Sequence, residues 1–553
     1  MPRPALRLLA LAMFLVAGTA ARAQGFLPPP GGGYLPGMGG TGYVPPAGID
    51  TRVGDLRGYF DQAFGNVPAP QGPAITYSAG LDVSEIYDTN AVTSDKGTHD
   101  LITQVTPAVG VTADTARLTG SLFYNPSLLF FAYHSNQSHI AQSLNAASTA
   151  IIVPEWLTLD LRAYAADQAI SGYYGPGVTP ALSKSNSVLT YSYSAAPSLH
   201  HAFGGTAVVE LGYTISYSSY GGYNNAPSNP GTASNQGLNQ SSISQEERGL
   251  IATGEDFGRF SNSLLADGQQ STGSGAFTNS HDNRISNTVG YAISYNLSAN
   301  ASLGYENLSY SGSNGYATQG VTWSIGGHWT PSPDSDFTAS YGRNQGQNSL
   351  FLNATFSPAP NTHVFVTHSQ SVGTNVSNLQ RAVAGTTVGP NGVTFINNTN
   401  IPTVLTNNFI GVRPGLFRTT TTSVTAAVTH PRDLYTVSIA HYDNSQLATA
   451  FTGSTVNNST TSTYGSISWG HDLADDLHSN LLANYGINGG SGVTNQGFNN
   501  NQNSYLLNAT LTYSVSDTLS VSGSFTQTNA PSGINGRVGS REIAIVSLHK
   551  TFF

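Results

Sequence analysis

Apolar and polar residues alternate along the chain from residue 74 to the C-terminus. In residues 157–165 and 207–217, Leu, Ala, Val, Ile or Tyr fills the odd-numbered positions, and mainly Thr, Ser, Gly or charged residues fill the even ones. Residues 507–515 and 519–525 show the same alternation. Successive side chains of a β-strand point to opposite faces, so the pattern predicts strands with one apolar and one polar face.

Two kinds of connection separate the predicted strands. The long connections are rich in Gly and Asn, as in residues 221–241, 371–417 and 486–503. The others are short and turn-like. If the sheet begins and ends on the same side as ten such turns, the chain forms about 22 strands, within a range of about 18 to 26. Ten such turns are predicted, at residues 113–114, 153–156, 200–205, 254–256, 296–302, 332–336, 358–361, 431–433, 474–476 and 516–517.

Short turns that alternate with long loops are typical of bacterial outer-membrane barrels, in which the turns face the periplasm and the loops face the exterior. The apolar face of each strand must meet lipid or a second layer, and in lipid only a closed sheet leaves no unpaired edge. The opposite face is too polar for a dry core between two soluble sheets. A soluble β-solenoid would need a strict short repeat, and none is apparent. We therefore predict an all-β fold, a closed antiparallel transmembrane β-barrel formed by residues 74–553.

Aromatic residues and the last strand agree with this prediction. Outer-membrane barrels place aromatic side chains at both membrane surfaces. The final strand is predicted over residues 543–553, with Ala544, Val546, Leu548 and Phe552 on its apolar face and Phe553 on the other. A terminal aromatic residue is expected of a barrel inserted by the outer-membrane assembly machinery. The candidates for the aromatic belts are Tyr124, Trp156, Trp323, Trp329, Trp469 and Tyr513.

Composition excludes several other classes of protein. Charged residues make up 9% of the 553 residues and hydrophobic residues 39%. After the first residues no run of about 18 apolar residues could form a spanning helix, which argues against a helical membrane protein. The chain has no cysteine, which excludes disulfides, thiolate metal ligands and a cysteine nucleophile. The formal net charge of −9 gives no electrostatic basis for binding nucleic acid.

The N-terminal residues have the features of an export signal. Arg3 and Arg7 precede an apolar segment at residues 8–16, and residues 21–23 fit the small-x-small cleavage pattern. We therefore predict a signal peptide at residues 1–23, cleaved near Ala23. Residues 24–73 are rich in Pro and Gly, which disfavours both helix and sheet. We interpret them as a periplasmic arm or a partial filler of the lumen.

Motifs near the start of the predicted barrel resemble a known family. Residues 87–90 read YDTN, residues 100–111 read DLITQVTPAVGV, residues 116–124 read ARLTGSLFY and residues 153–157 read VPEWL. Over residues 75–165 the chain resembles the beta-barrel porin 2 family, which includes outer-membrane proteins associated with bacterial exopolysaccharide and PEP-CTERM protein-sorting loci. The resemblance implies outer-membrane residence and a link to polysaccharide export. The family has no established catalytic residues, so none is transferred, and residues 371–417 are longer and more polar than the family leads us to expect.

Few charged residues fall on the polar faces of the predicted strands. They could filter solutes in the lumen by charge and hydrogen bonding, or acids and bases such as Asp160 and Arg162 could simply neutralise each other along the wall. Sparse charge with many hydroxyl and amide groups predicts weak ion selectivity, which suits neutral or weakly charged solutes, including sugars. The predicted lumen-lining residues are Asp82, Arg117, Asp160, Arg162, Glu210 and Glu306.

The sequence contains no strong motif for catalysis or metal binding. Residues 200–201 (His-His) and the His/Asp group at residues 471–478 adjoin predicted turns, but their spacing matches no established metal motif. No nucleophile motif such as G-x-S-x-G occurs in a suitable context, so we expect no enzymatic activity, cofactor or metal. Energised siderophore and vitamin transporters carry a folded plug of well over a hundred residues, and residues 24–73 are too few to form one.

The leading functional hypothesis is a porin-like passive channel for hydrophilic solutes in the bacterial outer membrane, with exopolysaccharide passage as a candidate role. The alternative is a structural or surface-interaction barrel without a transport role, whose long loop at residues 371–417 contacts matrix or neighbours. The expected partners are outer-membrane lipid and lipopolysaccharide, the barrel assembly machinery and, as a candidate, polysaccharide. Nucleic acid is not an expected partner.

Overall fold

A computed structural model gives the three-dimensional structure. It describes residues 74–92, 98–169, 184, 187–222, 240–274, 278–311, 315–332, 335–384, 386–388, 394–396, 402–403, 415–448, 459–491, 502–529, 531–532, 537–538 and 540–552. The predicted signal peptide at residues 1–23, the predicted arm or lumen filler at residues 24–73, and Phe553 lie outside the described residues. Among the described residues, no helix has the length and apolar character needed to cross a membrane.

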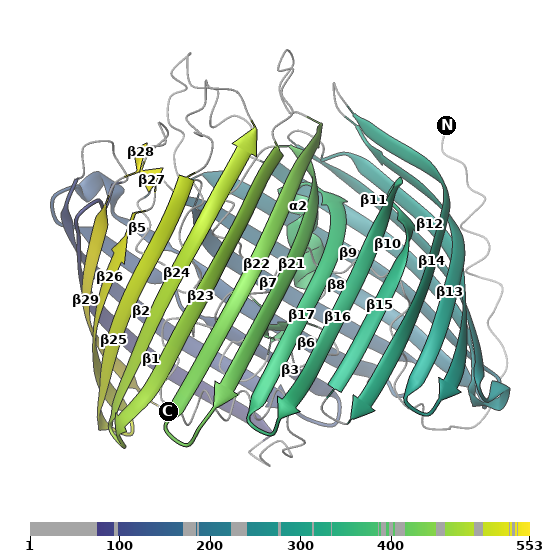
Figure 1. The fold of residues 1–553 in the computed structure, drawn as a ribbon, viewed down its shortest axis with the longest axis horizontal. Helices are drawn as coiled ribbons and strands as arrows, with labels where there is room; N and C mark the ends of the chain where they lie inside the picture. The colour runs from purple at the N-terminus through teal and green to yellow at the C-terminus, as the bar shows by residue number, and fades with distance from the viewer. Residues whose placement is uncertain are drawn as a thin grey trace.

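One antiparallel sheet of 24 segments closes on itself to form a barrel (Figure 1). The sheet closes because β1 (Ile75–Asp88) pairs with β2 (Asp100–Asp114) on one side and with β29 (Arg541–Thr551) on the other. Two strands are interrupted. One consists of β3 and β4, which both pair with β2, and the next consists of β5, which pairs with β4, and β6, which pairs with β3. Counted as continuous strands, the segments form the 22-strand barrel that the sequence predicted.

The remaining strands follow one another around the barrel in chain order. They are β3 (Leu118–Tyr124), β4 (Ser127–Phe131), β5 (His139–Ala141), β6 (Ser143–Val153), β7 (Leu157–Ala169), β8 (Ser187–Phe203), β9 (Ala207–Gly222), β10 (Gln240–Thr253), β11 (Phe260–Ser274), β12 (Ser280–Ser294), β13 (Leu297–Tyr310), β14 (Tyr316–Ser332), β15 (Ser335–Asn344), β16 (Gln347–Ala359), β17 (Thr362–Gly373), β21 (Leu416–Thr429), β22 (Asp433–Ala448), β23 (Ser459–Ala474), β24 (Leu477–Ser491), β25 (Gln502–Ser516) and β26 (Leu519–Thr528). Outside the barrel sheet, the 374–415 connection contains the helix α2 (Asn375–Ala384) and three short segments, β18 (Thr386–Val388), β19 (Thr394–Ile396) and β20 (Pro402–Thr403), while β27 (Pro531–Ser532) pairs with β28 (Arg537–Val538). Two short 3-10 helices lie in connections: η1 (Ser135–Gln137) between β4 and β5, and η3 (Glu255–Phe257) between β10 and β11.

Ten short connections lie at one end of the barrel, where β1 begins and β29 ends, as the sequence predicted. We call this the short-turn end and the opposite one the loop end. All ten connections overlap or adjoin the predicted turns. The loose turn predicted at residues 296–302 is a tight turn at residues 295–296, and residues 297–302 belong to β13.

The two faces of the wall are also as predicted. Leu211 in β9 is 50% exposed and Leu511 in β25 is 47% exposed, whereas Tyr220, of opposite parity to Leu211, is 6% exposed. Tyr220 packs against α2, which lies inside the ring of strands (Figure 1). The apolar rows therefore face outward and the polar rows face the lumen. In β29 the outward row is Ala544, Val546, Leu548 and Phe552.

Aromatic side chains gather on the outer wall near the short-turn end. Trp156 lies in the connection that follows β6, and its ring stacks on His201 with centroids 4.0 Å apart. Trp469 stacks on Tyr435 and donates a hydrogen bond from its indole Nε1 to Asp433 (2.8 Å). Trp329 and Tyr513 also lie near short connections, whereas Tyr124 and Trp323 lie further along their strands.

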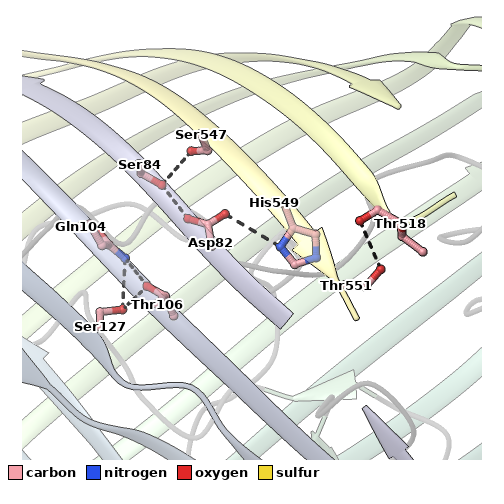
Figure 2. A network of polar contacts seen from close by, with 9 residues as sticks. All are labelled: Asp82, Ser84, Gln104, Thr106, Ser127, Thr518, Ser547, His549 and Thr551. Carbon is pink, nitrogen blue, oxygen red and sulfur yellow. Dashed lines mark hydrogen bonds and ion pairs between the residues drawn. The ribbon is translucent and has the colours of Figure 1, made fainter. Parts of the chain in front are cut away.

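The seam between the first and last strands is held by polar groups on its lumen side. Midway along the seam, Ser84 Oγ lies 2.9 Å from Ser547 Oγ and 2.6 Å from Asp82 Oδ1 (Figure 2). Near the loop end, the Arg541 guanidinium binds the Asp88 carboxylate with both Nε and Nη2. Both side chains are almost fully buried. The ion pair therefore fixes β29 to β1 where the sheet closes.

Removal of the guanidinium should destabilise the seam strongly. Arg541→Met leaves the Asp88 carboxylate buried without its partner, so we expect the free energy of unfolding to fall by about 3 to 5 kcal/mol. The measurement is urea unfolding of the barrel in detergent micelles or vesicles. The double variant Arg541→Met/Asp88→Asn removes the stranded charge and keeps an acceptor for the Asn90 backbone N–H, which binds Asp88 Oδ1 at 2.9 Å. It should regain part of the loss, and equal instability of the single and double variants would contradict the assignment.

Candidate functional site in the lumen

Hydroxyl groups cover much of the lumen wall and bind one another across neighbouring strands. Ser192 and Ser218 are 2.6 Å apart between β8 and β9, and Thr367 and Ser423 are 2.6 Å apart between β17 and β21. On β2 and β4, the Gln104 amide donates to Thr106 and Ser127 (Figure 2). Each hydroxyl both donates and accepts, so these pairs make a neutral surface that can exchange hydrogen bonds with a polar solute.

The helix α2 is fixed to the inner wall by its apolar face. Val376, Leu379 and Val383 have the spacing of one helical face, and each is at most 4% exposed. They pack against Tyr164, Val188 and Tyr220 of β7, β8 and β9. The helix begins with a cap in which the Ser377 backbone N–H binds Thr374 Oγ1 (3.1 Å). The 374–415 connection therefore places a folded helix in the lumen.

Polar contacts hold the polar side of α2. The Gln380 side-chain amide donates to the backbone oxygen of Ser242 in β10 (3.3 Å). The Arg381 guanidinium donates to Val372 O (2.8 Å) and to Asn378 Oδ1 (2.6 Å). Together with the apolar contacts, these bonds give the helix one position on the wall.

The β15–β16 turn also folds into the lumen. It consists of Gln345 and Gly346, with φ of 51° and 76°. Gln345 Oε1 accepts a hydrogen bond from the Val372 backbone N–H (2.9 Å), and the Glu306 carboxylate accepts bonds from the backbone of both turn residues. A Cβ at Gly346 would lie 2.6 Å from Thr318 Oγ1, so glycine permits the turn to lie against the wall.

A band of charges crosses the lumen wall next to these two elements. Arg248, Asp267, Arg284 and Glu306 are successive cross-strand partners on β10, β11, β12 and β13. Positive and negative side chains therefore alternate around this part of the wall. In the adjacent row toward the loop end, Glu246, Gln269 and Asp282 are partners in the same way, and Arg381 of α2 lies close enough to Asp282 to interact electrostatically. We call the seven charged residues of the two rows and α2 the charged band: Glu246, Arg248, Asp267, Asp282, Arg284, Glu306 and Arg381.

The residues that the sequence singled out lie at scattered positions on the wall. Glu306 alone belongs to the charged band, and it is 3% exposed. Asp82, Asp160, Arg162 and Glu210 occupy inward positions nearer the short-turn end. Asp160 accepts a hydrogen bond from Thr149. Arg117 was placed wrongly on the lumen wall: it lies exposed in the connection between β2 and β3, because β2 continues to Asp114 and β3 begins at Leu118.

The sequence did not reveal the other members of the charged band, for a local reason. In residues 245–248 (Gln-Glu-Glu-Arg) both faces of β10 are polar, so the two-residue period disappears. Glu246 and Arg248 face the lumen, and Glu247 lies exposed on the outer face. Asp267, Asp282 and Arg284 join the band only through the register of β11 and β12. Their pairing is a tertiary property.

The histidine groups flagged beside the turns do not converge on one site. His478 binds Asp472 (2.7 Å) on the lumen side, whereas His471 binds Asp433 (2.8 Å) on the outer side. In the part of the chain that the structure describes, no three His, Cys, Asp or Glu residues are grouped so that they could hold a metal ion.

The fold and the lumen define a transmembrane β-barrel of the outer-membrane type, with a helix and a turn folded into its interior. The sequence matches no protein-family model and no curated protein. Among solved structures, the FrpB iron transporter of Neisseria meningitidis is similar at 9% identity and a TM-score of 0.48, over 94% of this chain and 86% of that one. The siderophore receptor PirA of Pseudomonas aeruginosa is similar at 9% identity and a TM-score of 0.41, over 87% and 82%. At these values the similarity carries no information on cargo or partners.

The position of α2 can be trapped chemically. The chain has no cysteine, so a pair introduced as Gln380→Cys/Ser242→Cys should be the sole source of a disulfide. Because the two residues are in contact, we expect the bond to form under mild oxidation, with a shift in electrophoretic mobility that reductant reverses. The control pair Gln380→Cys/Ser423→Cys uses an inward residue of β21. Cross-linking of the control as fast as of the test pair would show that the helix has no fixed position.

Proposed function

We propose that the protein is an outer-membrane channel through which hydrophilic solutes pass passively, and that α2, the β15–β16 turn and the charged band form its constriction. The observation that carries the proposal is a helix docked by its apolar face inside a closed barrel, beside paired charges and hydroxyl groups. A closed polar wall supports a water-filled path, and an inward-folded segment narrows it.

The chemistry of the constriction favours solutes with little net charge. Its seven charged residues comprise four carboxylates and three guanidinium groups, which lie side by side and offset one another. The surrounding hydroxyl pairs can exchange hydrogen bonds with a sugar as readily as with water. Neutral polar solutes, including saccharides, therefore fit the site best, and the resemblance to proteins of exopolysaccharide loci agrees with that class.

Release of the helix should widen the channel. Leu379→Asp places a carboxylate against Tyr164 and Tyr220. Burial of this unpaired charge costs on the order of several kcal/mol, so α2 should leave the wall. We expect single-channel conductance in planar bilayers to rise at least about twofold. Asn378→Asp adds the same charge to the same helix outside the apolar contact, and its conductance should stay near that of the unaltered protein.

The same recordings decide between transport and a structural role. A purified, folded barrel that passes no current, with or without Leu379→Asp, would remove the channel proposal and leave the structural or surface-interaction barrel. Passage of neutral oligosaccharides into liposomes, measured by osmotic swelling, tests the solute class separately.

A further inference from the structure

A second set of ionisable side chains faces the lumen at the short-turn end. Its members lie on strands spread around the barrel, within six residues of a short connection or strand end. The exception is Asp82, which is the cross-strand partner of His549. Five are histidines, six are carboxylates and one is an arginine. The set comprises His200, His328, His363, His478, His549, Asp82, Asp114, Asp160, Glu210, Asp336, Asp472 and Arg162. We call it the histidine–carboxylate ring.

Two of the histidines bind a carboxylate, and a third lies close to one. His328 Nε2 lies 2.7 Å from Asp336 Oδ2 between β14 and β15. His478 Nδ1 lies 2.7 Å from Asp472 Oδ1 between β24 and β23. At the seam, His549 Nδ1 lies 4.0 Å from Asp82 Oδ2, and both side chains are about a quarter exposed (Figure 2). Contact with a carboxylate favours the protonated form of an imidazole.

The remaining two histidines have different neighbours. His200 in β8 is the cross-strand partner of Glu210 in β9. His363 in β17 binds the Ser357 hydroxyl through Nδ1 at 2.8 Å. On the neighbouring strand β7, Asp160 and Arg162 face the lumen opposite Ala196 and Ser194 of β8.

Uncharged residues occupy the other cross-strand positions beside these histidines. Ser298 and Thr338 flank His328, Thr512 lies opposite His478 on β25, Ser520 lies opposite His549 on β26, and Ala427 lies opposite His363 on β21. Within the described residues, the charge at this end of the lumen therefore depends on the ring itself.

Protonation removes the net charge of the ring. With neutral histidines, six carboxylates and one guanidinium give a net charge of −5. With all five imidazoles protonated the net charge becomes zero. Histidine ordinarily titrates near pH ~6.5, where carboxylates and guanidinium groups keep their charge.

We propose that the histidine–carboxylate ring is a second ion-selectivity filter, at the short-turn mouth of the lumen, that protons switch from cation-preferring to non-selective. The proposal rests on the proposed channel function, since ions must traverse the lumen. It goes beyond that function by assigning pH control to residues remote from the constriction.

The test is the ion selectivity of the full-length protein in planar bilayers under a salt gradient. Between about pH 7.5 and about pH 5 we expect the permeability ratio of sodium to chloride to fall at least about twofold, with a midpoint near the ordinary titration range of histidine. The variant His328→Gln/His478→Gln/His549→Gln should lose most of that fall. Retention of the full pH response by this variant would overturn the proposal.

A matched control uses histidines of the outer wall. His368 and His441 face outward, and each binds a threonine hydroxyl at 2.7 Å. The variant His368→Gln/His441→Gln should keep the complete pH response. If this control removes the response, the switch lies elsewhere and the ring is not its origin.

A further variant tests a carboxylate partner. Asp336→Asn removes the anion that binds His328, which should move the midpoint to lower pH. An unchanged midpoint would contradict the pairing. If the unaltered barrel conducts with the same selectivity at both pH values, the ring proposal fails while the channel proposal stands. If it passes no current, both fail.

Discussion

The hydrogen bonds between the first and last strands determine everything else in this molecule. In a membrane the unpaired N–H and C=O groups of an edge strand have no water to bind, so an open sheet of this length could not remain in lipid. The register of β1 on β29, from Gly80 opposite Thr551 to Asp88 opposite Ile543, removes both edges. The buried pair of Asp88 and Arg541 adds a charged contact at that place. Closure in turn separates an outer, lipid-facing surface from an inner, polar one.

Among the residues that the structure describes, the interior of the barrel has no continuous apolar core. Small buried clusters lie on the lumen side instead, one beneath α2, one at the seam around Ile86 and Ile102, and one around Leu308 and Leu416. Each forms where a connection or strand segment covers part of the inner wall. The helix α2 lies where the wall offers Tyr and Val, whereas the β15–β16 turn lies against the polar side chains Glu306 and Thr318.

Two charge systems share the lumen, and they differ in chemistry. The charged band pairs carboxylates with guanidinium groups across neighbouring strands. The ring near the short-turn end combines carboxylates with imidazoles, the side chains that ordinarily change charge in the physiological range. A channel with both would carry ion-paired charges at its constriction and histidines at its short-turn mouth.

The sequence by itself determined the wall. A two-residue period places side chains on alternate faces whatever the partner strand, so the strands, the approximate positions of the ten short turns, a barrel of about 22 strands and the outward row of the last strand could be predicted. Only the tertiary structure decided what lies within the wall. The charged band exists because Arg248, Asp267, Arg284 and Glu306 fall in one register across four strands. The same holds for α2, whose place depends on Tyr164, Val188 and Tyr220, residues that are more than 150 positions away in the chain. Such contacts join distant segments, and no local pattern in the chain encodes which of them meet.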